Sequence, residues 1–357
     1  MKRLTREMIE AASLGGCLLG GGGGGALAKG RSMGELALQV GQPRLAGLDE
    51  LAADALLVTV SAVGAPAAEG QFCTPMHYVR AVELLRESGL AIAGLVTSEN
   101  GGLASINGWF QSAVLDIPVV DAPCNGRAHP MGTMGSIGLH KLEGYVSRQA
   151  AAGGDPQRGA YTELVVSAGV AEAARLVRQA AVSAGGMVAV ARNPVTAAYA
   201  REHAAPGAIS QAIELGRIML AARPAGAAAA AAEFLGGQLA ATGVVRRLAL
   251  ETRGGFDLGR LVVDDGSAEY ELSFWNEYMT LERGGRRLAT FPDLIATVDA
   301  ASGLPLPTAD LRDGMRVALV TAPKRSLILG AGVRDPELFR EAEKTLGLEI
   351  IRYSFKD

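Results

Sequence analysis

The distribution of apolar residues along the chain changes near residue 242. Before that point, segments of helical periodicity alternate with short continuous apolar runs at 55–60, 90–97, 117–120, 164–166 and 187–190. Continuous apolar strands separated by helices indicate a mostly parallel sheet with helices on both faces. We therefore predict a three-layer α/β/α domain over residues 1–242.

The pattern after residue 242 is typical of a different architecture. Short β-like runs are separated by glycine-containing turns, and they lie at 244–250, 258–263, 269–274, 278–282, 294–298 and 315–321. This spacing predicts a small antiparallel β-barrel-like domain over residues 243–323. The remaining residues, 324–357, read as a strand at 326–331 and a helix at 335–346, which we expect to dock on the α/β domain.

The first residues are read as a helix rather than a leader segment. Charged Arg6, Glu7 and Glu10 interrupt the stretch that would have to be apolar in a lipoprotein-type signal. Thr5 is a suitable N-cap for the helical spacing that follows it. The odd number of cysteines, three, favours free thiols in a reducing compartment. We therefore expect a cytoplasmic protein.

Charge and hydropathy exclude two classes of partner. The net charge is −3, and no basic stripe with interleaved aromatic residues is present, so we expect no nucleic-acid partner. No run approaches the roughly 18 apolar residues of a membrane span, so we expect no membrane insertion. We expect the protein to bind a small-molecule substrate. We also expect it to form a homo-oligomer.

Glycine is unusually abundant, and six glycines are consecutive from Gly20 to Gly25. The run has neither the lysine spacing of a P-loop nor a preceding strand, as a dinucleotide fingerprint requires, so we expect no nucleotide cofactor. Two interpretations are open, a flexible connector or a loop that presents backbone N–H groups to a ligand. We favour the ligand-facing loop, because ordering six glycines without a purpose wastes conformational entropy.

Polar residues follow two of the apolar runs, where ligands of α/β sheets usually bind. Ser98-Glu99-Asn100-Gly101-Gly102 follows the second run, and the densest polar segment, 121–130, follows the third. The latter segment contains Asp121, Cys124, Asn125, Arg127 and His129. Such a concentration of polar groups is costly to bury unless the groups are paired or in use.

Each of these groups has a structural and a chemical interpretation. Asp121 is either a helix cap or a catalytic or ligating carboxylate. Cys124 is a core filler, a nucleophile or a metal ligand. His129, one of four histidines, is a candidate acid or ligand. A divalent metal such as zinc, held by Asp121, Cys124 and His129, is one option, although no standard ligand spacing is present.

Seven short motifs in order resemble the DUF917 family, also called S-methyl thiohydantoin desulfurase-like. They are a helix running into the glycine loop, Glu99-Asn100-Gly101-Gly102-Leu103, 120–128, 207–217, Gly254-Gly255-Phe256, Asn276-Glu277 and Pro292-Asp293-Leu294. Two places depart from the family pattern. Ala26-Leu27-Ala28 replaces Asp-Pro-Tyr, and Ala128-His129-Pro130-Met131 replaces Ala-Phe-Pro-Glu.

The resemblance implies an α/β/α domain with a barrel-like domain and action on thiohydantoin or hydantoin rings. It also implies a hydantoinase/oxoprolinase-type partner. We therefore predict a hydrolase that desulfurises or opens such a ring. Glu99 or Asp121 would be the general base, His129 an acid, and Cys124 a nucleophile in one variant of the mechanism. The substrate would contact Gly22, Gly23, Gly24, Asn100, Asn125, Arg127, Asn276 and Glu277.

A second hypothesis belongs to another class of protein. The chain would then be a non-catalytic metabolite-binding or accessory subunit of a hydantoinase/oxoprolinase assembly. The concentration of titratable groups at strand ends argues against this hypothesis, because a passive module does not need them.

Overall fold

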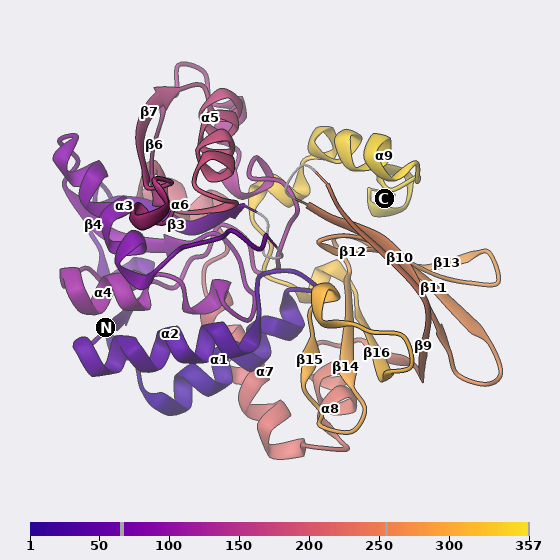
Figure 1. The fold of residues 1–357 in the computed structure, drawn as a ribbon. Helices are drawn as coiled ribbons and strands as arrows, with labels where there is room; N and C mark the ends of the chain where they lie inside the picture. Colours follow the sequence, from indigo (N-terminus) through magenta and orange to yellow (C-terminus); the bar gives the residue numbers. More distant parts are fainter. Residues whose placement is uncertain (65–67, 254–255, 356–357) are drawn as a thin grey trace.

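The computed structural model describes residues 1–64, 68–253 and 256–355. The predicted turn at Gly254-Gly255, and most of a predicted strand stop at 64–66, lie outside these residues. Figure 1 shows an α/β part, coloured indigo to pink, beside a second sheet coloured brown and orange.

The first sheet has eight strands in the order β1-β2-β5-β4-β3-β8-β6-β7. They span Lys2–Arg3, Arg44–Ala46, Val119–Val120, Ile92–Thr97, Leu56–Gly64, Met187–Thr196, Ser147–Gly153 and Thr162–Ala168 in that order. Strands β2, β5, β4 and β3 pair in parallel, whereas the other pairings are antiparallel. The sheet is therefore mixed, and the prediction of a mostly parallel sheet is wrong.

A strand that the sequence pattern did not reveal explains two of the four antiparallel pairings; the other two are β1 with β2 and β3 with β8. Strands β7 and β8 are joined by a helix, as predicted, but β6 lies between them and pairs antiparallel with both. The sequence of β6, Ser-Arg-Gln-Ala-Ala-Ala-Gly, lacks the β-branched and aromatic residues by which strands are recognised.

Eight helices precede the second sheet in the described part of the chain, and the last of them packs against two strands of that second sheet (Figure 1). They are α1 Arg6–Leu19, α2 Leu27–Val40, α3 Pro75–Glu87, α4 Trp109–Leu115, α5 Val170–Ser183, α6 Ala197–His203, α7 Ala208–Ala222 and α8 Ala227–Phe234. Thr5 caps α1 as predicted, because its hydroxyl accepts a hydrogen bond from Met8 N. Apolar residues of α3 pack with Val58 and Val60 of β3, and those of α5 pack with Val63 of the same strand.

Part of the glycine excess is used where two helices touch. A Cβ atom on Gly15 of α1 would lie 1.9 Å from Ala212 O of α7, and one on Gly216 of α7 would lie 1.9 Å from Ala11 O. Side chains at either position would force the helices apart.

The second sheet is antiparallel throughout, in the order β13-β12-β11-β10-β9-β16-β14-β15. Its strands span, in chain order, Gln238–Arg253, Phe256–Asp264, Glu269–Trp275, Glu277–Arg283, Arg286–Thr290, Leu294–Asp299, Pro305–Leu306 and Arg316–Ala322. The six predicted strands are present, and β13 and β15 are additional. The three-layer arrangement and closure of this sheet into a barrel stay predictions.

The C-terminal residues differ from the expected strand and helix. No strand forms at 326–331, because this segment bonds to side chains: Gly330 N donates to Asn125 Oδ1 at 3.2 Å, and Ser326 O accepts from Gln211 Nε2. Short helices α9, Arg340–Leu346, and α10, Ile351–Ser354, follow. Among the described helices, none is long and apolar enough to cross a membrane.

Candidate functional site

The glycine run joins the two sheets. It follows the end of α1, and its carbonyl groups accept hydrogen bonds from the second sheet: Gly21 O from Tyr278 N at 2.8 Å and Gly22 O from Thr308 N at 2.9 Å. Gly24 O accepts from Leu103 N and Ala104 N in the loop after β4. Four of the six glycines have positive φ, which explains why other residues would be strained there.

Three of the six N–H groups of the run are engaged within the protein. The N–H groups of Gly20, Gly21 and Gly23 donate to carbonyls within the end of α1 and the turn. The run also provides close approach. A Cβ atom on Gly23 would lie 1.8 Å from Glu277 Oε1, and one on Gly21 would lie 2.6 Å from Arg127 Nη2. The loop therefore lies directly against Arg127 and Glu277.

Glu99, which is largely buried, and His129, which is buried, form a pair. Glu99 follows the end of β4, and its Oε2 lies 3.2 Å from the donating backbone N and 3.1 Å from Nδ1 of His129. Burial raises the pKa of Glu99 to about 8, although the His129 N–H and the charges of Arg192 and Arg127 oppose the shift. Burial, reinforced by Arg192, lowers the pKa of His129 to about 3. Near neutral pH the imidazole is uncharged and the carboxyl can gain or lose a proton.

Arg192 is a member of this site that the sequence analysis missed. It comes from the middle of β8, where Thr59 of β3 and Gln149 of β6 are its partners across the sheet. Its charge acts on the pKa values of Glu99, His129 and Cys124. The available signal was a charged residue directly after the apolar run 187–191, inside a strand expected to be buried.

Cys124 is buried beside these residues as a thiol. Its Sγ lies 3.2 Å from Thr59 Oγ1, and burial raises the pKa of Cys124 to about 11. A thiol with such a pKa carries little thiolate at neutral pH, which weakens the interpretation of Cys124 as a nucleophile.

Arg127 and Glu277 form the other half of the site. The guanidinium of Arg127 lies 4.3 Å from the centre of the Phe291 ring, and its Nη1 donates to Pro292 O and Asp293 O. Burial lowers the pKa of Arg127 to about 10, opposed by the charges of Glu277 and Asp293. Burial and the charge of Glu99 raise the pKa of Glu277 well above its usual range.

Several buried polar atoms of this cluster have no hydrogen-bond partner among the described residues. These atoms are Nε and Nη2 of Arg127, Nε of Arg192 and Oε2 of Glu277. Nδ1 of His129 does not belong with them, because it lies 3.1 Å from Glu99 Oε2. Buried polar groups normally have partners, and those that lack them are places where a ligand or water bonds. The cluster therefore leaves several buried donors and one acceptor unused, beside a carboxyl that can exchange a proton near neutral pH.

Four other predicted residues have their polar atoms engaged by the fold. Asp121 caps α7: its Oδ1 accepts from Ile209 N at 2.8 Å, and its Oδ2 accepts from Ser210 Oγ at 2.5 Å. Asn100 donates to Gly126 O and Ala208 O and accepts from Ser105. Asn125 and Asn276 bond to backbone groups. These side chains position loops, and the structure does not show them with free groups for a ligand.

The predicted metal ligands do not form a metal-binding group. Among the described residues, no cluster of three or more His, Cys, Asp and Glu side chains could hold a metal ion. The proposed set fails for a physical reason, because the carboxylate of Asp121 is bonded to the N-terminus of α7 and the thiol of Cys124 to Thr59.

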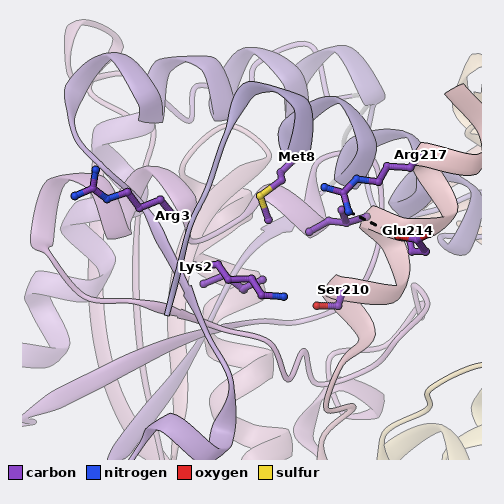
Figure 2. A pocket seen from close by; sticks show the side chains of 8 residues that line it. Lys2, Arg3, Met8, Ser210, Glu214 and Arg217 are labelled. Atoms are coloured by element: carbon purple, nitrogen blue, oxygen red, sulfur yellow. Dashed lines mark ion pairs between the residues drawn. The ribbon is translucent and has the colours of Figure 1, made fainter. Parts of the chain in front are cut away.

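A surface pocket lies elsewhere and contains none of the predicted site residues. Figure 2 shows this pocket of about 460 Å³ between β1, α1 and α7, lined by Lys2, Arg3, Met8, Ser210, Glu214 and Arg217 among others. Arg217 pairs with Glu7 at 2.8 Å and with Glu214 at 3.7 Å, so its charge is already compensated.

Two sheets joined by a glycine loop over a buried cluster of carboxyl, guanidinium and imidazole groups define an α/β protein with an enclosed polar site. Family models match most of the chain: "S-Me-THD-like, N-terminal domain" matches residues 7–156, and "S-Me-THD-like, C-terminal domain" matches residues 169–330. The chain belongs to the S-Me-THD-like family, as the motif resemblance predicted. The interval between these matches, residues 157–168, contains β7 of the first sheet, so it does not coincide with the border between the two sheets.

One solved structure supports the fold. The crystal structure of a protein from Chromobacterium violaceum, a structural genomics target, is 20% identical and covers 97% of both chains with a TM-score of 0.71. No curated protein matches the sequence.

Proposed function

We propose that the protein is a hydrolase that acts on a five-membered thiohydantoin or hydantoin ring, by desulfurisation or ring hydrolysis. Family membership supports a role related to this chemistry. The observation that carries the proposal is the set of unpartnered buried atoms on Arg127, Arg192 and Glu277. Such rings alternate carbonyl or thiocarbonyl acceptors with N–H donors. The guanidinium groups would bond the acceptors, and Glu277 would bond an N–H group.

In the mechanism we propose, Glu99 is the general base. A water molecule gives a proton to Glu99 while its oxygen adds to the ring carbon that carries sulfur. Arg127 stabilises the negative charge that develops on the ring. The carbon–sulfur bond then breaks, and the proton on Glu99 passes to the departing sulfur to give a thiol. The proton of the added hydroxyl group moves to the ring nitrogen, which leaves a ring carbonyl. A pKa near 8 suits Glu99 to both transfers close to neutral pH.

His129 positions this base, and Asp121 and Cys124 have other roles in the proposal. The His129 backbone N–H and imidazole both lie near Glu99 Oε2, so they orient the carboxyl group. Asp121 holds α7 in place and Cys124 fills the core beside Arg192. A divalent metal, self-association and a hydantoinase/oxoprolinase-type partner remain proposals that the experiment below includes as conditions.

The experiment incubates purified protein with S-methyl thiohydantoin and with hydantoin, with and without added divalent metal and a hydantoinase-type partner. We expect thiol release or ring opening, and a loss of about a hundredfold or more in kcat for Glu99→Gln, as for loss of a general base. Glu143→Gln, an exposed matched control, should keep wild-type rates. Absence of both reactions under all conditions, together with ring binding and co-purification with a partner, would instead establish the accessory-subunit hypothesis.

A further inference from the structure

Arg192, which belongs to the cluster around Glu99, has a second arginine, Arg178, as its neighbour on the side toward α5. Arg192 of β8 is 6% exposed and lies on the same face of the sheet as Val190, two residues earlier in the strand. Helix α5 covers that face, because its Val177 and Ala181 pack with Val190. Arg178 of α5 is largely buried and close enough to Arg192 for the two charges to interact.

Neither arginine is satisfied by the protein. Nε of Arg192 and Nη1 of Arg178 are buried and have no hydrogen-bond partner among the described residues. The charge of Arg192 adds to burial in lowering the pKa of Arg178, so the two guanidinium groups repel one another. Buried guanidinium nitrogens without partners are costly, and an anion placed between these two groups would remove both the repulsion and the missing hydrogen bonds.

The acidic groups nearby do not fill this role. Glu99 interacts with Arg192, but its pKa of about 8 leaves it mostly protonated at neutral pH. Glu341, whose charge reaches Arg178, is exposed on α9. Arg178 is nevertheless held in a fixed orientation, since its guanidinium stacks 4.5 Å from the centre of the Phe256 ring at the start of β10.

We propose that Arg178 and Arg192 form a subsite for a carboxylate group of the substrate. The inference rests on the proposed function and narrows it, because the ring would carry an acidic side chain at the position that points from Glu99 toward α5. Planar guanidinium groups match the two oxygens of a carboxylate, and such charge-assisted pairs are the stronger kind of hydrogen bond.

The experiment compares hydantoin-5-acetic acid with hydantoin-5-acetamide, which has the same shape without the charge. Binding is measured by titration calorimetry and turnover by kcat/KM. We expect the wild type to prefer the acid by about tenfold or more, and Arg178→Gln to lose most of that preference. Arg178→Lys should keep part of it. Arg175→Gln, on the same helix and paired with Glu172 at the surface, should keep it fully.

The outcomes separate this inference from the proposed function. Equal binding and turnover of the acid and the amide would overturn the carboxylate subsite while leaving the hydrolase intact. Tighter binding of the acid that depends on Arg178, without turnover of either compound, would support the subsite and count against the hydrolase. Thermal unfolding of each variant identifies any loss caused by misfolding, in which case Arg178→Lys carries the comparison.

Discussion

At the scale of single residues, burial decides which groups can do chemistry. Glu99 and Asp121 both follow strands of the first sheet, and the sequence treats them as equivalent candidates for the base. In the structure Asp121 is occupied by three donors at the start of α7, whereas Glu99 is buried beside an uncharged imidazole. The difference depends on which elements meet each carboxyl group, and spacing along the chain does not contain that information.

The raised pKa of Glu99 predicts a specific pH dependence of stability. Between its ordinary value of 4.5 and about 8, the folded protein holds a proton on Glu99 that the unfolded chain has released. Raising the pH through this window should therefore lower the free energy of unfolding. Glu99→Gln should show a flatter profile in urea unfolding between pH 5 and 8. The unfolding equilibrium constant of the wild type should rise by about two decades more than that of the variant over this range.

The pKa of Glu277 is also raised, so Glu277 adds its own pH dependence to the stability of every variant. The stability profile of Glu99→Gln must therefore be compared with that of the wild type, and it is not expected to be flat. Glu143→Gln is the control, because this exposed side chain should leave the wild-type slope unchanged. Identical slopes for Glu99→Gln and the wild type would show that Glu99 is ionised in the folded protein at neutral pH.

The pKa of His129 is lowered rather than raised, and it affects how stability depends on pH below neutrality. Its pKa is lowered from 6.5 to about 3, so the unfolded chain takes up a proton in this window that the folded protein refuses. Stability should therefore fall as the pH drops from about 6.5 toward 3. His129→Gln should make the protein less sensitive to acid, as measured by the urea midpoint at pH 4 and pH 7; an unchanged difference between the two would contradict this.

At the scale of elements, the sequence predicted those with a strong periodic signal. Helix α3 begins at Pro75 after Thr74 and ends near Gly89, as the proline and glycine positions indicate. The missed strands lack a strong sequence signal for different reasons. Three of the seven residues of β6 are alanine and none is β-branched or aromatic, whereas β15 has only two residues. Arg192 was missed together with the sheet order, because only the placement of β8 beside β3 and β6 brings it to Glu99.

Asp121 provides a test at this scale. Its carboxylate accepts from Ile209 N and Ser210 N at the start of α7, so Asp121→Ala should lower the free energy of unfolding by about 1 kcal/mol, as for loss of a helix cap. Activity per folded molecule should change far less than in Glu99→Gln. Chemical unfolding and kcat are the measurements, with exposed Asp54→Ala as the control. A loss of kcat as large as that of Glu99→Gln would return Asp121 to the catalytic candidates.

At the scale of the whole molecule, the site exists only because the two sheets meet. Glu99, His129 and Arg192 come from the first sheet and the loops that follow its strands, and Glu277 comes from the first residue of β12 in the second. The glycine run lies between them and bonds to both parts. The family motifs predicted that these segments belong to one site. What brings them together, however, is the close contact of the glycine backbone with both sheets, and no pattern of side chains predicts that contact.

A substitution at Gly23 can test the contact between the glycine run and Glu277 of the second sheet. Its φ is not in the left-handed region, so alanine adds no backbone strain there, but the new methyl group would lie 1.8 Å from Glu277 Oε1. Gly23→Ala must displace Glu277 or the loop, and it should lower the free energy of unfolding by about 1–3 kcal/mol, the usual cost of overpacking. Because Glu277 moves with it, ring binding should weaken as well.

Gly169→Ala is the matched control, since a methyl group there meets nothing within 4 Å. Urea unfolding and calorimetric titration of hydantoin would measure both effects; wild-type stability and binding in Gly23→Ala would show that the loop and Glu277 are not in contact in solution.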